Sequence, residues 1–336
     1  MHEKIGVIGA GSWGTTLADL LAKKGHEVTL WAYEPELVQE MAETGVNSLF
    51  LPGISLSPRL RFTNSLQEAA AGTDMLLFVV PSQVVRGVIK AIIPSLPKEA
   101  VIVSASKGIE LETLMLVSQI FEELLPGELY RNFAALSGPT FAREVAQEMP
   151  TAVVAAAADT RVAGHVQKSF TTGYFRVYTN NDVTGVELGG AVKNVIAIAA
   201  GILDGLGLGD NTKAALMTRG LYEMTRLGVA LGAQSKTFAG LAGMGDLTVT
   251  CISRHSRNRL LGEKIGRGKT LDQALGEMTM VAEGLNTAKA ALDLAETVGV
   301  EIPITQEVYN VLFKGKTASD AVKSLLARVA KPEHDQ

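Results

Sequence analysis

The chain has 336 residues, of which 47% are hydrophobic and 20% are charged, and its formal net charge at pH 7 is -4. This balance gives no electrostatic support for binding nucleic acid, and the length favours two domains. One cysteine, Cys251, excludes an intramolecular disulfide framework, and the first residues run into a strand pattern without a signal peptide, so we expect a cytoplasmic protein. The five scattered histidines show no metal-ligand spacing, and no metal site is predicted.

The first half of the chain alternates short runs of β-branched residues with helical patterns. Strands are predicted at 4–9, 27–32, 74–80 and 100–106, with helices near 15–24 and 84–93. Further strands are predicted at 132–138, 151–157 and 175–180. This alternation predicts a parallel sheet covered by helices, which is a doubly wound α/β fold.

The second half changes character, because almost everything from residue 184 to residue 330 reads as helix interrupted by glycine-rich segments. We therefore predict two domains, residues 1–183 and residues 184–330, the second of them all-α. Its most apolar stretch, residues 191–205, contains three polar residues and is shorter than the roughly 20 residues that a membrane span needs. Insertion into a membrane is not expected.

Residues 9–14 read GAGSWG directly after the first predicted strand and at the start of the first predicted helix. In this pattern Gly9 permits a tight turn, Gly11 lets the backbone approach a pyrophosphate, and Gly14 lets helix and strand pack closely. The anion would lie at the helix N-terminus. A purely structural turn is the alternative, but the context predicts a Rossmann-like dinucleotide-binding domain. Trp13 could cover the cofactor or pack in the core or an interface.

The end of the second strand usually carries an acidic residue that binds the ribose hydroxyls of NAD. Here Ala32 and Tyr33 occupy that place, and Glu34 comes later. The missing acid removes a repulsion against the 2′-phosphate of NADP, although no arginine is near to bind it. The sequence therefore predicts NADP or NAD as the cofactor, with a weak preference for NADP.

Two polar segments lie at the carboxyl ends of buried strands, where open α/β sheets bind ligands. Lys107 follows the strand at 100–106, and LSGPTFA, residues 136–142, ends the strand at 132–138. Lys107 could be a surface lysine, but its position favours a ligand contact. In LSGPTFA, Gly138 and Thr140 could contact a ligand or merely form a turn, and both interpretations stay open.

Two segments of the helical half carry further polar groups. LAGMGDLTVTC places Asp246 in a glycine loop that we expect to be flexible. The segment SRNR, near an expected helix start, offers a hydroxyl, a guanidinium and an amide from Ser256, Arg257 and Asn258. Such groups suit a phosphate. A solvated basic face is an equally good interpretation, because Arg254 and Arg259 are nearby.

Lys193 lies inside the apolar helical pattern of residues 185–205. Burying an unpaired ammonium costs several kcal/mol. The lysine therefore either lies at a rim, with its stem along apolar surface, or faces an internal site. The pattern alone leaves both interpretations open.

The chain resembles the bacterial NAD(P)-dependent sn-glycerol-3-phosphate dehydrogenase family in eight segments, which in order are GAGSWGTTLA, SASKGIE, LSGPTFA, ELGGAVKNVIAIAAG, GDNTKAAL, LAGMGDLTVTC, SRNR and VAEGLNT. They span nearly the whole chain. The resemblance implies an enzyme that interconverts dihydroxyacetone phosphate and sn-glycerol 3-phosphate, a small phosphorylated substrate. It also implies a supply of glycerol 3-phosphate for phospholipid synthesis, and a homodimer is possible.

The resemblance further implies roles for individual residues, with Lys193 as the general acid/base. The cofactor would contact Gly9, Gly11, Ser12, Trp13, Gly14, Tyr33, Lys107, Ala142, Arg257, Val281 and Glu283. The substrate would contact Lys107, Gly138, Thr140, Lys193, Asn194, Asp246, Thr250, Ser256, Arg257 and Asn258. Many relatives carry a basic residue where Ala32 and Tyr33 stand, so their NADP preference does not transfer directly.

In such a reaction one amine would donate a proton to the developing alkoxide in reduction and accept the hydroxyl proton in oxidation. A lysine with a pKa of about 10.4 is a poor base at neutral pH, but apolar surroundings and a neighbouring cation such as Lys107 would lower that pKa. Two other functions are weaker hypotheses. One is another two-domain oxidoreductase, such as a keto-acid reductase or a phosphogluconate-type dehydrogenase. The other is a non-catalytic dinucleotide sensor, which would have no reason to keep Lys193, Asp246 and Arg257 together.

Overall fold

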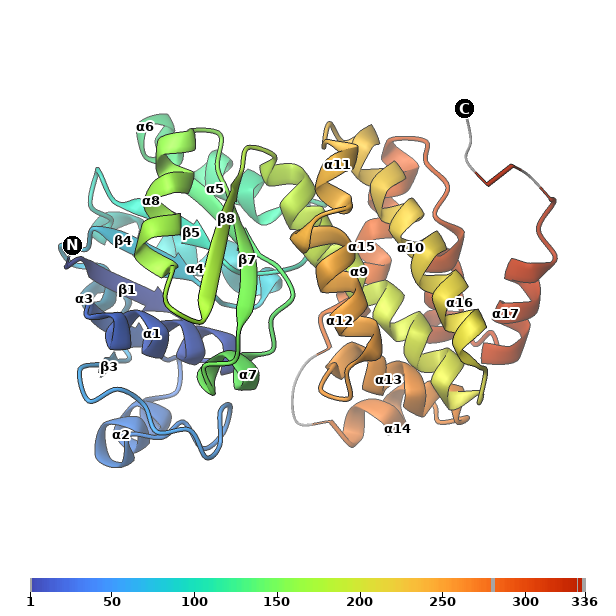
Figure 1. Cartoon of the computed structure of the whole chain (residues 1–336), viewed down its shortest axis with the longest axis horizontal. Helices are drawn as coiled ribbons and strands as arrows, with labels where there is room; N and C mark the ends of the chain where they lie inside the picture. Colours follow the sequence, from blue (N-terminus) through green and yellow to red (C-terminus); the bar gives the residue numbers. More distant parts are fainter. Residues whose placement is uncertain (1, 279–281, 331, 334–336) are drawn as a thin grey trace.

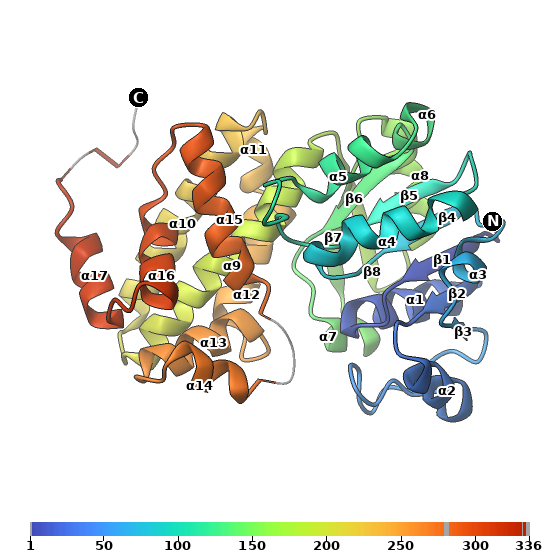
Figure 2. The same ribbon diagram turned by 180° about the vertical axis from the view of Figure 1, so that it is seen from behind.

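The structure, a computed structural model, describes residues 2–278, 282–330 and 332–333. A sheet with helices on both faces forms the first part, and helices packed around α9 form the second (Figure 1; Figure 2). The strands are β1 (Lys4–Ile8), β2 (Glu27–Trp31), β3 (Arg61–Thr63), β4 (Met75–Phe78), β5 (Val101–Ser104), β6 (Phe133–Ser137), β7 (Thr151–Ala156) and β8 (Phe175–Asn180).

The helices of the first part connect these strands. They are α1 (Ser12–Lys24), α2 (Pro35–Thr44), α3 (Leu66–Ala70), α4 (Val85–Ile92), α5 (Val117–Leu124), α6 (Gly127–Tyr130), α7 (Ala142–Ala146) and α8 (Thr160–Phe170). Two short 3₁₀ turns, η1 (Ser82–Val84) and η2 (Ile93–Ser95), flank α4. The predicted helices near 15–24 and 84–93 correspond to α1 and α4.

The eight strands form one sheet in the order β3-β2-β1-β4-β5-β6-β7-β8. One face is covered by α1, α2, α7 and α8 through apolar residues such as Leu17, Met41 and Phe170. The other face is covered by α3, α4, α5, α6 and the start of α9, with Ile89 and Phe121 in its core. The predicted doubly wound α/β architecture is confirmed.

The sheet departs from the predicted parallel arrangement at one junction. β7 runs antiparallel to β6, while β8 is parallel to β7. A parallel crossover needs a helix that carries the chain back across the sheet. The segment between β6 and β7 contains only the five-residue α7, so β7 starts at the edge where β6 ends. The short edge strand β3 was not predicted.

The second part consists of helices around α9 (Val183–Gly205), whose residues from 185 to 203 are all buried. The surrounding elements are α10 (Asp210–Ala230), α11 (Ser235–Phe238), the π-helical turn η3 (Leu241–Gly245), α12 (Asp246–Ile252), α13 (Arg257–Gly266), α14 (Leu271–Gly276), α15 (Gly284–Thr297), α16 (Pro303–Phe313) and α17 (Ala318–Leu326). The all-α second part is confirmed. β8 ends at Asn180 and α9 begins at Val183, so the predicted division between residues 183 and 184 falls just inside α9; this boundary stays a prediction.

α9 is longer than the apolar stretch of residues 191–205, on which the argument against a membrane span rested. Among the described residues, it is the one helix that is long and apolar enough to cross a membrane by length and composition. The argument from insufficient length is therefore wrong. The whole apolar window is buried inside the protein, as in the core helix of a globular domain.

α9 and α13 approach each other closely enough for their backbones to touch. A Cβ atom on Gly201 would collide with the carbonyl oxygen of Arg259, and one on Gly262 would collide with that of Ile198. Glycine at these positions thus allows α13, which begins with Arg257, to lie directly on the helix that carries Lys193.

We predict that Gly201→Ala lowers the stability of the protein, because the new methyl group forces the two helices apart, at a cost of about 1–3 kcal/mol. The matched control is Gly164→Ala in α8, where a Cβ meets no atom within 4 Å. Higher helix propensity should make this control neutral or stabilising, by up to about 1 kcal/mol. Thermal unfolding of both variants is the measurement, and equal melting temperatures would contradict the packing argument.

Candidate functional site

The glycine loop between β1 and α1 has the predicted geometry. Gly9 has a φ of 117°, and a Cβ on Gly14 would collide with the Gly9 carbonyl oxygen. Gly11 faces open space, because a Cβ at this position would meet no atom within 4 Å. No side chain caps the N-terminus of α1, and its first turn holds no acidic residue. The loop therefore fits the pyrophosphate of a dinucleotide.

An unpredicted residue, Asn47, braces this loop. Its buried side-chain amide donates to the Ala10 carbonyl at 2.9 Å and to the Thr15 hydroxyl at 2.8 Å, and its oxygen accepts from the Phe50 amide at 2.9 Å. The Ser12 hydroxyl donates to the Phe50 carbonyl at 2.6 Å. The sequence contains no motif that identifies Asn47, because the contact joins segments 37 residues apart.

The other residues of the first part that were expected to contact the cofactor lie beside the glycine loop or directly after β2. Trp13 is half-buried and packs toward Phe175, with ring centroids 6.4 Å apart, which supports a packing role. The Ala142 carbonyl accepts from Thr16 of α1 at 3.2 Å. Past β2, Ala32 is 1% exposed whereas Tyr33 is 79% exposed. Of these two residues, only Tyr33 presents its side chain to solvent.

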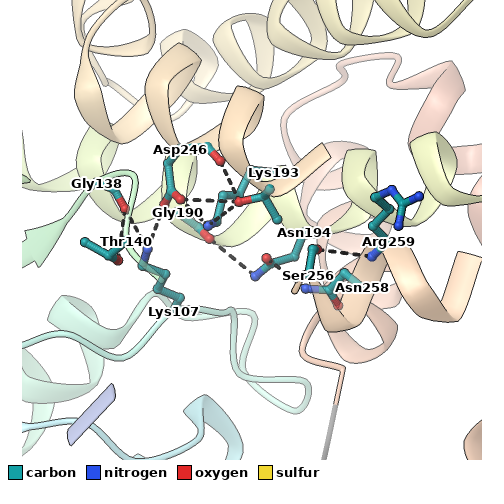
Figure 3. A network of polar contacts seen from close by, with 11 residues as sticks. Lys107, Gly138, Thr140, Gly190, Lys193, Asn194, Asp246, Ser256, Asn258 and Arg259 are labelled. Atoms are coloured by element: carbon teal, nitrogen blue, oxygen red, sulfur yellow. Dashed lines mark hydrogen bonds and ion pairs between the residues drawn. The ribbon is translucent and has the colours of Figure 1, made fainter. Parts of the chain in front are cut away.

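Two lysines from different parts of the fold meet on one carboxylate (Figure 3). Lys107, three residues after β5, donates to Asp246 Oδ2 at 2.6 Å. Lys193, from the middle of α9, forms an ion pair with Asp246 Oδ1 and donates to Thr250 Oγ1 at 2.9 Å. Lys193 is 6% exposed and Asp246 is 0% exposed. Lys193 therefore does not lie at a rim but faces an internal polar cluster, and its role in a functional site stays a prediction.

Asp246 does not lie in a flexible glycine loop, contrary to the prediction. It is the first residue of α12 and follows directly on the π-helical turn η3. The glycines allow tight packing rather than mobility, because a Cβ on Gly243 would collide with the backbone of Phe238. Thr250, one turn later, donates its hydroxyl proton to the Asp246 carbonyl at 2.5 Å. Its oxygen lone pairs are left to accept from Lys193.

Burial lowers the pKa of Lys193 to about 8. The Asp246 carboxylate opposes this shift, and the positive charge of Lys107 adds to it. Loss of water around the ammonium is thus the main cause. Near neutral pH an amine with this pKa can both hold and release a proton.

The LSGPTFA segment reaches the same network through its backbone. The Gly138 carbonyl accepts from Lys107 Nζ at 3.4 Å and from the Thr140 hydroxyl at 3.2 Å. Gly138 has a φ of 148°, so its turn needs glycine. A Cβ on Gly190 would come within 2.8 Å of Ser137 Oγ, so α9 lies close beside this segment here. Gly138 therefore forms a turn and contacts Lys107, while a contact of this segment with a ligand stays a prediction.

A second chain of polar contacts starts next to Lys193. Asn194 Oδ1 accepts from the Asn258 amide at 2.9 Å, and Asn258 Oδ1 accepts from the Gly284 amide at 2.9 Å. Ser256 caps α13 as expected near a helix start, because its hydroxyl accepts from the Arg259 amide at 3.2 Å. The structure thereby brings Asn194, Ser256 and Asn258 to one end of α13.

Arg257 is exposed in the first turn of α13, and Glu283 faces it across the start of α15. Desolvation raises the pKa of Glu283, while the charge of Arg257 and a 3.4 Å hydrogen bond from Ser82 oppose the rise. Ser82 was not predicted, although the segment PSQ follows β4 at the ligand-binding edge. Val281 lies outside the described residues.

The solvated basic face that SRNR suggested does not include Arg259. Arg259 is 13% exposed and pairs with Asp204 at 2.7 Å and with Glu263 at 3.3 Å. Arg254, by contrast, is exposed. Arg257 is exposed like Arg254 and differs in environment only from Arg259. Within the described residues, no group of three or more His, Cys, Asp or Glu side chains is arranged to hold a metal ion.

We predict that the two neighbours of Lys193 shift its pKa in opposite directions. Asp246→Asn should lower the pKa of Lys193 below about 8, because the carboxylate raises it, and Lys107→Met should raise it. Lysine ¹³Cε chemical shifts followed through a pH titration measure this directly. Lys289→Met, at an exposed position of α15, is the control and should leave the titration unchanged. Shifts of the same sign in both variants would contradict the assignment.

Comparisons with known proteins agree with this geometry. Residues 4–163 match the model of the NAD-dependent glycerol-3-phosphate dehydrogenase N-terminus, and residues 182–323 match that of its C-terminus. The chain is 66% identical over 333 residues to glycerol-3-phosphate dehydrogenase [NAD(P)+] of Geobacter sp. (strain M21), covering 99% of both chains. It is 52% identical over 334 residues to the enzyme of the same name from Chlorobium limicola, with 99% of both covered.

Solved structures give the same result. The crystal structure of glycerol-3-phosphate dehydrogenase from Coxiella burnetii has a TM-score of 0.92 at 38% identity, covering 97% of this chain and 99% of that one. A PanE/ApbA family ketopantoate reductase from Ralstonia eutropha has a TM-score of 0.62 at 19% identity, which shows a shared fold alone. The chain therefore belongs to the NAD(P)-dependent glycerol-3-phosphate dehydrogenase family and is an oxidoreductase that uses NAD or NADP.

Proposed function

We propose that Lys193 moves the proton in the reaction of this glycerol-3-phosphate dehydrogenase, the interconversion of dihydroxyacetone phosphate and sn-glycerol 3-phosphate. The observation that carries the proposal is a buried amine with a pKa of about 8, held by Asp246 and Thr250. Bound NAD(P)H supplies the hydride in the reductive direction. The protein has to supply the proton, and Lys193 is the group suited to do so.

In reduction, the Lys193 ammonium donates a proton to the alkoxide oxygen and becomes a neutral amine. In oxidation, the neutral amine accepts the proton of the substrate hydroxyl. Asp246 and Thr250 keep the amine oriented in both states through the contacts at Oδ1 and Oγ1. Lys107 balances the charge of Asp246, so that the carboxylate does not hold Lys193 permanently protonated. Lys107 and the Gly138 and Thr140 segment would contact the substrate beside the amine.

We further propose that the N-terminus of α13 binds the substrate phosphate. Arg257 offers a guanidinium fork there, and the Ser256 hydroxyl and Asn258 amide lie on either side of it in the chain. The contact between Asn258 and Asn194 links this end of α13 to the residue after Lys193. Phosphate bound at Arg257 would in this way set the position of the carbonyl relative to the amine. Glu283 would hold Arg257 between substrate and cofactor.

The direct test is a 340 nm absorbance assay with dihydroxyacetone phosphate and either NADH or NADPH. Turnover with this substrate, and little with branched keto acids, is the expected outcome. Supply of glycerol 3-phosphate for phospholipid synthesis, a cytoplasmic location and a homodimer stay predictions.

We predict that Lys193→Ala lowers kcat by a factor of about a hundred to ten thousand, the usual range for loss of a positioned acid or base. Folding and cofactor binding should persist, because Asp246 keeps its 2.6 Å contact with Lys107. Steady-state and single-turnover kinetics, together with cofactor titration, are the measurements. A variant that kept more than about half of the wild-type single-turnover rate would show that the lysine is structural.

If Lys193 carries the proton, the activity of the wild type should depend on pH in opposite ways in the two directions of the reaction. Oxidation of glycerol 3-phosphate needs the neutral amine, so its kcat/KM should rise as pH increases through about 8. Reduction needs the ammonium and should fall over the same range. Both inflections should disappear in Lys193→Ala.

We predict that Arg257→Ala raises the KM for dihydroxyacetone phosphate about ten- to a hundredfold, or roughly 1.4–2.7 kcal/mol. Arg257→Lys should already lose measurable affinity, because a point charge replaces a planar fork. Arg254→Ala, at an exposed position three residues earlier, is the matched control and should leave KM unchanged.

Dihydroxyacetone, which lacks the phosphate, should be a very poor substrate that the variant handles no worse than the wild type. An equal loss with both substrates would mean that Arg257 acts through the fold or the cofactor, and Lys107 would become the next candidate for the phosphate contact.

We predict that both cofactors support turnover, with NADPH at least as good as NADH, because Ala32 and Tyr33 rather than an acid directly follow β2. Tyr33→Asp should then shift the preference toward NADH, since an exposed carboxylate can accept from the ribose hydroxyls and repels a 2′-phosphate. The substitution belongs at Tyr33 because Ala32 is buried. Ratios of kcat/KM measure the effect, and a wild-type preference for NADH above about a hundredfold, or ~2.7 kcal/mol, would refute the prediction.

A further inference from the structure

A groove of about 520 Å³ lies between the outer strands of the sheet and α11, the elements drawn at the centre of Figure 1. β7, β8, the start of α8, α11 and η3 line it. Its volume is within the range of small-molecule sites, roughly 300–1,000 Å³. None of the residues with a proposed role in catalysis, substrate binding or cofactor binding lines it.

The polar groups in the lining are hydroxyls, amides and one ammonium, without a carboxylate. They come from Thr160, Tyr178, Thr179, Asn180, Asn181, Lys236 and Thr237. Lys236 is exposed and makes no ion pair within the part of the chain that the structure describes. The Arg176 guanidinium lies 5.3 Å from the ring centroid of Tyr178 and adds a second positive charge. The lining thus suits an anion.

Two acidic residues flank the lining in the sequence, and both are already engaged. Asp159 pairs with Arg161 at 2.6 Å. Asp182 is buried and accepts hydrogen bonds from the Gln234 amide at 2.8 Å and from the Thr237 hydroxyl at 2.6 Å. Neither leaves a carboxylate among the groove-lining residues to balance Lys236.

The groove is coupled to the Lys193 site through the turn η3. Its lining includes Leu241 and Ala242, which begin this turn, and the turn leads directly into Asp246. η3 also touches α9 backbone to backbone, since a Cβ on Gly189 would collide with the Ala242 carbonyl. Gly189 is one helical turn before Lys193. A shift of η3 would therefore move Asp246 relative to Lys193.

We propose that this groove binds a small anion with hydroxyl groups, a phosphorylated or carboxylated polyol, and that the bound anion holds Asp246 in contact with Lys193. A ligand that bridges Lys236 and the first turn of α8 holds η3 against α9. Because Asp246 raises the pKa of Lys193, occupancy of the groove makes the amine more basic. The regulatory half of the proposal rests on the proposed role of Lys193, whereas binding itself does not.

Binding is tested by amide NMR of the full chain with two probes, glycerol 2-phosphate and glycerate. The titrations use Arg257→Ala, so that the proposed phosphate site does not compete. Chemical-shift changes across residues 236–242 with either probe are expected, and the two titrations show whether phosphate or carboxylate is preferred. If neither probe shifts these amides, the groove is not an anion site.

Two lysine variants distinguish binding in the groove from nonspecific attraction of the anionic probe to the protein surface. Lys236→Ala should weaken probe binding at residues 236–242 at least about tenfold and leave the basal activity unchanged. Lys289→Ala, which removes an exposed lysine from α15, should change neither. Unaltered affinity in Lys236→Ala, or equal weakening in both variants, overturns the proposed site.

The proposed coupling between the groove and Lys193 is tested by a separate measurement, the pKa of Lys193. A saturating probe should raise the pKa of Lys193, followed by ¹³Cε shifts, in Arg257→Ala but not in the double variant with Lys236→Ala. Binding at residues 236–242 without a change in this pKa overturns the regulatory half. Because neither measurement uses turnover, a failure here is distinct from a failure of the Lys193 mechanism.

Discussion

The structure depends on one buried carboxylate. Asp246 is fully inaccessible to solvent and accepts from lysines that belong to opposite parts of the chain, Lys107 after β5 and Lys193 in α9. A lone buried charge of either sign would cost several kcal/mol, so each of the three groups needs the others. Burial, with a smaller contribution from the charge of Lys107, lowers the pKa of Lys193 to about 8 against the opposing effect of Asp246.

Close backbone contact is what allows α9 to reach this position. Gly189 touches η3, Gly190 touches the end of β6, and Gly201 touches α13. At Gly189 and Gly201 a methyl group would collide with the backbone of the neighbouring element and push it away, which would move Asp246 or α13 relative to Lys193, whereas at Gly190 it would meet only the Ser137 side chain. The apolar, glycine-rich character of α9 therefore serves the placement of the amine as much as the stability of the core.

The polar residues near Lys193 differ in how far they are buried and paired. Arg259, two residues after Arg257, forms ion pairs with Asp204 and Glu263, while Arg257 is exposed beside Glu283. Two arginines in one short motif thus have different surroundings, since Arg259 joins α13 to Asp204 of α9 and Arg257 is exposed to solvent. On the cofactor side, burial of Ala32 leaves Tyr33 as the residue that presents its side chain past β2.

The sequence by itself determined the alternation of strands and helices, the helical second half, the glycine loop and the ligand-binding edge that carries Lys107, because periodicity and turn chemistry are local. It left open whether Lys193 faces a rim or a site and placed Asp246 in a loop. Only the tertiary structure decided these points, together with the antiparallel β7, the brace at Asn47 and the contact of Ser82 with Glu283. Each depends on contacts between segments far apart in the chain, whose partners no local pattern encodes.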